Sequence, residues 1–120
     1  MKKILIAEDE KSLALTLFRK VSSLGYDCVQ ARDGEETLKK FKSEKPDLVL
    51  LDIVMPYKNG LEILEEIRIR EHSKVPIIIL SNLGQSEDIG IAKKLNVSEY
   101  YIKSNISLKE LSIKIHELLS

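Results

Sequence analysis

A small set of polar side chains stands directly after short strand-like segments of this sequence, where these side chains could do chemistry. They are Glu8 and Asp9 after residues 4–7, Asp52 after 48–51, Ser81 after 75–80, and Lys103 after 97–102. An apolar run without alternation, such as 48–51, indicates a strand covered on both faces, as in a parallel sheet. Ligands of open α/β sheets bind beyond the carboxyl ends of the strands, so these residues would converge on one edge.

Carboxylates gathered at one edge would repel each other unless a cation neutralised them. Carboxylate oxygens are the ligands that Mg²⁺, or another divalent cation such as Mn²⁺, accepts. The Ser81 hydroxyl could donate to a phosphoryl oxygen, and the Lys103 ammonium is a point charge suited to phosphate. A carboxylate can act as a covalent nucleophile, and phosphoryl transfer needs mainly positioning and charge neutralisation. We therefore predict that Asp52 accepts a phosphoryl group.

Each of these residues also has a plainer interpretation when it is taken alone. Glu8 and Asp9 could be solvated residues at the start of a helix, Ser81 could belong to a turn, and Lys103 could lie on the surface. Asp52 could simply close a strand. Their joint placement at strand ends is what favours a site.

Amphipathic segments follow the strands, and their apolar residues recur at helical spacing. A further strand is predicted at 27–31. Five helices are predicted, and each would bury one set of apolar residues. In chain order these sets are Leu13, Leu17, Val21 and Leu24; Leu38 and Phe41; Leu61, Leu64 and Ile67; Ile89, Ala92 and Leu95 within 85–95; and Leu108, Leu111, Ile115 and Leu118. Gly25 and Asn96 suit helix ends, and Asp33–Glu36 and Ser107–Glu110 resemble capping boxes. Right-handed crossovers then predict a single doubly wound α/β domain over 1–120, with a parallel sheet covered by helices on both faces.

Composition narrows the classes of function. Lysine plus arginine and aspartate plus glutamate are equal at 19 each, so bulk charge gives no reason to expect direct nucleic-acid binding. No apolar run approaches the roughly 20 residues that cross a bilayer, and the one after Met1-Lys2-Lys3 is too short for a signal peptide. We therefore expect a cytoplasmic protein without membrane contact. The single cysteine, Cys28, is interpreted as a small buried hydrophobic residue of an inner strand.

On these residues, the sequence resembles the receiver domains of two-component response regulators, of the chemotaxis-receiver type, over essentially its whole length. The matching positions are Glu8-Asp9, the run Asp47–Pro56, Asn59-Gly60, Ser81, and Tyr100 three residues before Lys103. The resemblance implies a flavodoxin-like five-stranded sheet in the order 2-1-3-4-5. It also implies that Asp52 takes a phosphoryl group from a histidine kinase or a histidine phosphotransfer protein.

The resemblance further implies a metal site around this carboxylate. Asp9, Asp52 and the backbone carbonyl of Val54 would ligate Mg²⁺, and Glu8 would contact the ion through water.

We expect no separate substrate to be turned over, so the protein would not be an enzyme. We also expect no organic cofactor to be bound. Val54 and Leu83 stand two residues beyond Asp52 and Ser81 and cannot orient an attacking water, so the acyl phosphate should be long-lived.

We also predict a switch that reports phosphorylation to a distant surface. Ser81 would move toward a phosphoryl oxygen, and Tyr100 would turn into the space left behind. This movement would reshape the face made by the fourth helix, fifth strand and fifth helix, where a downstream protein target would dock. The alternative is that Tyr100 is an amphipathic strand residue without a switching role.

The sequence departs from the family pattern at Asn96-Val97, where Gly-Ala is common and the change is interpreted as structurally tolerated, and at two positions beside the predicted site. Lys103 is followed by Ser104, where receivers usually have proline after a cis bond. Because a cis bond before a non-proline residue costs about 2.5 to 4 kcal/mol, we expect a trans bond. Asn82 replaces the usual small residue after Ser81, and it could either narrow access to the phosphoryl pocket or donate to it.

Three other functions fit parts of the pattern. A haloacid-dehalogenase-like phosphatase also uses a strand-end aspartate, but it expects a second acid where this chain has Val54. A flavodoxin-like cofactor binder needs a phosphate-cradling loop where Glu8-Asp9-Glu10 would repel phosphate. A degenerate receiver could serve only as a protein-interaction module, although the acids and Lys103 are intact.

Overall fold

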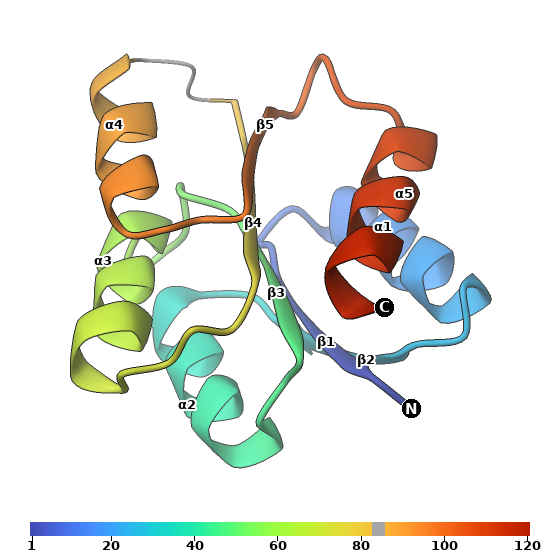
Figure 1. Cartoon of the computed structure of the whole chain (residues 1–120), viewed down its shortest axis with the longest axis horizontal. Helices are drawn as coiled ribbons and strands as arrows, with labels where there is room; N and C mark the ends of the chain where they lie inside the picture. Colours follow the sequence, from blue (N-terminus) through green and yellow to red (C-terminus); the bar gives the residue numbers. More distant parts are fainter. Residues whose placement is uncertain (83–85) are drawn as a thin grey trace.

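A sheet of five parallel strands runs through the middle of the computed structural model, which describes residues 1–82 and 86–120 (Figure 1). The strands are β1 (Lys3–Ala7), β2 (Asp27–Ala31), β3 (Leu48–Leu51), β4 (Ile77–Ser81) and β5 (Glu99–Ile102). Their order across the sheet is β2-β1-β3-β4-β5, and every neighbouring pair is parallel. The strand order implied by the family resemblance is therefore confirmed.

Helices cover both faces of the sheet, as the doubly wound prediction requires. They are α1 (Lys11–Ser23), α2 (Gly34–Glu44), α3 (Gly60–Glu65) with a π-helical continuation (Glu66–Arg70), α4 (Ser86–Lys94) and α5 (Leu108–Leu119). Figure 1 shows α1 and α5 on one face and α2, α3 and α4 on the other. Among the described residues, no helix combines the length and apolar character that crossing a bilayer requires.

The central strand β3 is buried along its whole length, which explains its unbroken apolar sequence. Leu48 and Leu50 pack in the cluster on the α1–α5 face, and Val49 and Leu51 pack in the cluster on the opposite face. Since successive strand residues point to opposite faces, both faces of β3 need apolar side chains. The residue after Leu51 is thereby placed at the carboxyl edge.

The predicted helix ends are found where the sequence places them. The Asp33 side chain accepts a hydrogen bond from the Glu36 amide at 2.8 Å, and Ser107 Oγ accepts from the Glu110 amide at 3.0 Å. Gly25 and Asn96 have the positive φ values of residues that end helices, 92° and 58°. These caps fix where α2 and α5 begin and where α1 and α4 end.

The third and fifth helices bury somewhat different residues from those predicted. Leu61 is only half-buried, and Ile63, which was not predicted to be buried, lies fully inside with Leu64. Because four apolar residues occur between positions 61 and 67, spacing alone did not decide which of them face the sheet. Leu108 is exposed because it is the first residue of α5, beyond the edge of the core.

The strand boundaries also differ at three places. The fourth and fifth strands begin at Ile77 and Glu99, two residues later than predicted, and Ser81 is the last residue of β4. Pro76 contributes its carbonyl to the Val49 amide but has no N–H for the ladder, so regular pairing starts after it. Cys28 is half-buried in β2, an edge strand and not an inner one. The predicted first residue of the fourth helix, Gln85, lies outside the described residues.

Candidate functional site

Three carboxylates converge at the carboxyl edge of the sheet, as predicted. Oxygens of Glu8, Asp9 and Asp52 all lie within 4.8 Å of one another. The Asp52 amide donates to the Ala7 carbonyl at 3.0 Å, which extends the pairing of β1 with β3 by one residue and aligns the two chain segments. Glu8 and Asp52 are buried, whereas Asp9 is exposed. Two carboxylates of the cluster are therefore shielded from solvent, and the third is in contact with it.

Lys103 joins the two buried acids. Its Nζ lies 2.9 Å from Glu8 Oε1 and 3.1 Å from Asp52 Oδ2. The Lys103 amide donates to the Ser81 carbonyl at 2.8 Å, so the end of β4 fixes the start of the lysine side chain. The peptide bond between Lys103 and Ser104 is trans, as expected.

Backbone amides hold the remaining oxygens of the two buried carboxylates. Glu8 Oε2 accepts from the Glu10 amide at 3.1 Å, and Asp52 Oδ1 accepts from the Val54 amide at 3.3 Å. Each buried acid therefore has one oxygen on the lysine and the other on the loop that follows its strand. This arrangement fixes the direction in which both carboxylates point.

The electrostatics of the cluster leave negative charge uncompensated. Burial raises the pKa of Glu8 to about 6 and also raises the pKa of Asp52, although the Lys103 ammonium acts in the opposite direction on both. Burial lowers the pKa of Lys103, but its hydrogen bond with Glu8 and the charge of Asp52 outweigh this, so the pKa is raised overall. One ammonium among three carboxylates leaves an excess of negative charge that a bound cation would relieve.

A cavity of about 290 Å³ opens beside the cluster, and its composition suits a hard cation. It is lined by Asp9, Glu10, Asp52, Val54, Asn82 and Lys103. Carboxylate and backbone oxygens are the ligands that Mg²⁺ takes, usually with waters retained, and the exposed Asp9 provides the wet side that such waters need. The residues present therefore fit a divalent cation of this class.

Gly60 is a residue of the site for which sequence analysis predicted no role. A Cβ atom at this position would lie 2.2 Å from the Asp52 carbonyl oxygen and 2.7 Å from Ile53 Cα. The Gly60 amide donates to the Ile53 carbonyl at 2.7 Å, so α3 begins directly against the segment that holds Asp52. The Asn59-Gly60 pair is one of the positions that match the receiver family, but its local sequence is that of an ordinary turn and indicates no contact with Asp52.

The known family whose description reads "Response regulator receiver domain" matches residues 4–116 of the chain. The chain belongs to the response regulator receiver family. This receiver domain is 41% identical over 118 residues to the probable transcriptional regulator ycf27 of Cyanophora paradoxa, a match that covers 98% of this chain and 48% of that protein. The chain thus spans about half the length of the curated relatives it matches.

Solved structures of receiver domains share the same fold. A response regulator receiver domain protein (CheY-like) from Methanospirillum hungatei JF-1 has a TM-score of 0.93 and 25% identity, covering 99% of this chain and 94% of that one. The response regulator protein TrrA from Thermotoga maritima, in complex with Mg(2+)-BeF, has a TM-score of 0.86 and 36% identity, covering 98% of this chain and 99% of that one.

The predicted switch residues of the receiver domain lie next to one another. Ser81 is fully buried at the end of β4, and Tyr100 of β5 is half-buried against the cluster on the α2–α4 face. Burial raises the pKa of Tyr100, and a side-chain hydrogen bond with Ser81 acts in the opposite direction. Leu83, which the lifetime prediction also used, lies outside the described residues.

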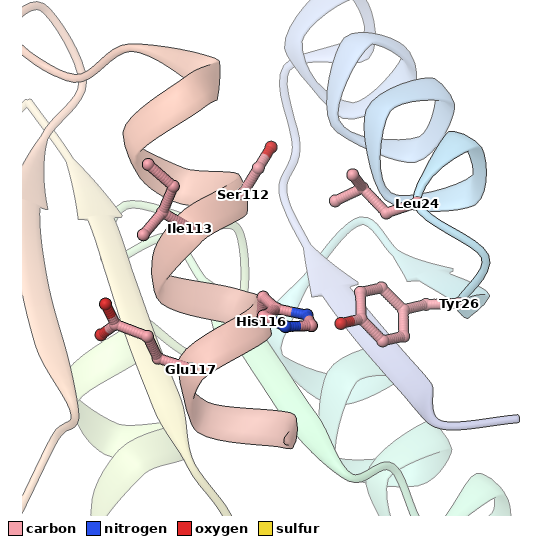
Figure 2. Close-up of a pocket in the computed structure, with 6 residues that line it drawn as sticks. All are labelled: Leu24, Tyr26, Ser112, Ile113, His116 and Glu117. Carbon is pink, nitrogen blue, oxygen red and sulfur yellow. The ribbon is translucent and has the colours of Figure 1, made fainter.

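A larger hollow of the receiver domain, about 480 Å³, lies between α5 and the segment that joins α1 to β2, and it contains none of the predicted site residues (Figure 2). It is lined by Leu24, Tyr26, Ser112, Ile113, His116 and Glu117. Figure 2 shows the side chains of His116 and Tyr26 pointing toward one another. The acidic cluster lies at the carboxyl edge of the sheet, so this hollow is separate from the candidate site.

Proposed function

We propose that this receiver domain accepts a phosphoryl group on the Asp52 carboxylate, from the phosphohistidine of a histidine kinase or of a histidine phosphotransfer protein. One observation carries the proposal: Asp52 is a buried carboxylate that borders the cavity while its Oδ2 lies 3.1 Å from Lys103 Nζ. Asp9 also borders the cavity, but it is exposed. A group held in this way is oriented before the donor arrives, which phosphoryl transfer requires.

The proposed reaction uses the residues of the cluster in distinct roles. A carboxylate oxygen of Asp52 forms the new bond to phosphorus, and the bond from phosphorus to the donor imidazole nitrogen breaks, leaving its electron pair on that nitrogen. The Lys103 ammonium neutralises charge on the phosphoryl oxygens, and the Ser81 hydroxyl donates to one of them. Glu8 keeps Lys103 in place through the 2.9 Å contact. No separate substrate is turned over.

We further propose that the site works with Mg²⁺, or Mn²⁺ in its place. Asp9, Asp52 and the Val54 carbonyl would be the direct ligands, and Glu8 would act through water. The bound ion supplies further charge neutralisation for the phosphoryl oxygens. The excess negative charge of the cluster supports this set, as does the magnesium named with the related TrrA structure.

The proposed unit is a single receiver domain over residues 1–120 that works in the cytoplasm. A downstream protein would bind the α4-β5-α5 face, and this unit itself would contact neither nucleic acid nor a membrane. The relatives are named as transcriptional regulators of about twice this length. An output that lies in another part of such a protein, or in a separate partner, is consistent with both features.

A direct test is to incubate the wild-type protein with a small phosphodonor and follow its intact mass. We expect the mass to rise by one phosphoryl group per chain when Mg²⁺ is present, because donor charge must be neutralised before Asp52 can attack. Chelating the ion should prevent the change. A mass that stays constant with both donor and ion present would instead support a degenerate receiver that only binds proteins.

The predicted switch can be tested separately at Tyr100. Adding a beryllofluoride phosphoryl mimic should shift NMR resonances along α4 and α5, because Ser81 and Tyr100 would rearrange together. In Tyr100→Ala these distant shifts should be lost, while shifts around Asp52 remain. Distant shifts of the same size in the variant would show that the ring does not carry the coupling.

A further inference from the structure

The loop between β3 and α3, residues 52–59, contains a strained turn. The Lys58 amide donates to the Pro56 carbonyl at 3.0 Å, and Tyr57 between them has a φ of 70°. This is a γ-turn with positive φ, the rarer and strained kind, and a non-glycine residue in such a conformation costs on the order of 1 to 3 kcal/mol. Tyr57 is 78% exposed, so packing of its side chain does not offset the strain. Other contacts must hold the turn.

The first residue of α2 provides one of these contacts. The Gly34 amide donates to the same Pro56 carbonyl at 3.1 Å. Amides in the first turn of a helix have no partner within the helix, so this bond satisfies one of them and fixes the loop at once. On the other side of the turn, the Lys58 side chain forms an ion pair with Glu66. The loop is therefore held between α2 and the π-helical continuation of α3.

The contact with α2 depends on the absence of a side chain at position 34. A Cβ atom on Gly34 would lie 2.1 Å from the Lys58 carbonyl oxygen, 2.4 Å from Lys58 Cβ and 2.7 Å from the Lys58 carbonyl carbon. Two of these atoms belong to the backbone, which cannot swing aside as the end of a side chain can. Any residue other than glycine would therefore push α2 and the loop apart.

We infer that Gly34 is a positioning residue for the Asp52 site, acting through the loop that it holds. Val54 stands two residues before Pro56 in this loop, and its amide donates to Asp52 Oδ1 at 3.3 Å. A shift of Pro56 and Lys58 would thus change both the orientation of Asp52 and the place of the Val54 carbonyl. The consequence for metal binding rests on the proposed function, whereas the contact between α2 and the loop does not.

The test is Gly34→Ala, with Gly90→Ala as the matched control. Outside the backbone of its own helix, a Cβ atom on Gly90 in α4 would meet no heavy atom of the described residues within 4 Å. In folded, metal-free protein, Gly34→Ala should move the amide resonances of Val54 and Lys58 and speed hydrogen exchange at Lys58, while the control should not. The Mg²⁺ affinity of Gly34→Ala, measured by titration, should fall about 10- to 100-fold, which is the loss typical of mutating residues that orient metal ligands. Wild-type affinity together with unchanged exchange at Lys58 would overturn the inference.

A second measurement uses only the wild-type protein, in case Gly34→Ala does not fold. Titration with Mg²⁺ should shift the Gly34 amide resonance, although α2 supplies no proposed ligand, and should leave Gly90 unmoved. A Gly34 resonance that stays still while Val54 shifts would refute the coupling. If the wild type binds no Mg²⁺ at all, the proposed function fails. Hydrogen exchange at Lys58 in folded, metal-free Gly34→Ala then decides separately whether α2 holds the loop.

Discussion

Asp52→Asn is expected to abolish phosphoryl transfer to this protein. An asparagine amide has nearly the same shape as the carboxylate but lacks its nucleophilic oxygen, so the reaction has no acceptor even though Lys103 keeps its 2.9 Å contact with Glu8. The measurement is the intact mass after incubation with a small phosphodonor and Mg²⁺. Asp27→Asn is a suitable control because this exposed aspartate begins β2, at the opposite edge of the sheet.

The same variant should remain folded, which separates loss of the acceptor from loss of the structure. The pKa of Asp52 is raised mainly by burial, so its charged form is penalised in the folded protein at neutral pH. Replacing it with a neutral group removes that penalty, and we expect a midpoint of thermal unfolding no lower than that of the wild type. Labelling of Asp52→Asn at the wild-type level would refute the assignment of the acceptor.

Asp9→Ala is expected to remove most of the Mg²⁺ affinity. Asp9 would supply one of the two direct carboxylate ligands, and it is the exposed member of the cluster. Loss of a residue that only orients a metal ligand typically lowers metal affinity about 10- to 100-fold, and loss of a direct ligand should cost more. We therefore expect the Mg²⁺ affinity to fall by at least about 100-fold. The affinity can be measured by calorimetric titration of the metal-free protein.

Glu10→Ala is the matched control for this change. Glu10 also lines the cavity, but only its backbone amide contacts the cluster, at Glu8 Oε2, and alanine keeps that amide. Removing its side-chain charge should therefore alter the Mg²⁺ affinity only slightly, through the field around the cavity. Equal losses in Asp9→Ala and Glu10→Ala would mean that net charge, and not ligation, governs binding of the ion.

The central features of the fold follow from local sequence. The run Leu48–Leu51 has no polar residue because both of its faces are buried, and this property predicts a central parallel strand with Asp52 at its carboxyl end. Once such strands lie parallel, the residues after β1, β3 and β5 lie at the same edge of the sheet, so a cluster of Glu8, Asp52 and Lys103 was predictable in outline. The order of the strands came from the family resemblance and not from spacing.

The close contacts around the loop could not be predicted in this way. Gly34 opens a helix and Gly60 follows a turn asparagine, and both positions accept glycine for ordinary local reasons. Gly34 approaches Lys58 only because α2 packs against a loop that is distant in sequence. Gly60 approaches Asp52 only because the loop between them folds back to bring the start of α3 against the end of β3. Likewise, Ile63 is buried more completely than Leu61 because of how α3 packs on the sheet, which the spacing of apolar residues does not reveal.

The most direct test of this account is to locate the phosphoryl group in the wild-type protein. After reaction with a small phosphodonor and Mg²⁺, borohydride reduction converts an aspartyl phosphate into homoserine, which peptide mass spectrometry can place in the sequence. We predict a single converted residue, Asp52, because it alone among the described carboxylates combines burial, the cavity edge and the 3.1 Å contact with Lys103. Conversion at Asp9 or at another acid, with Asp52 unchanged, would contradict the account.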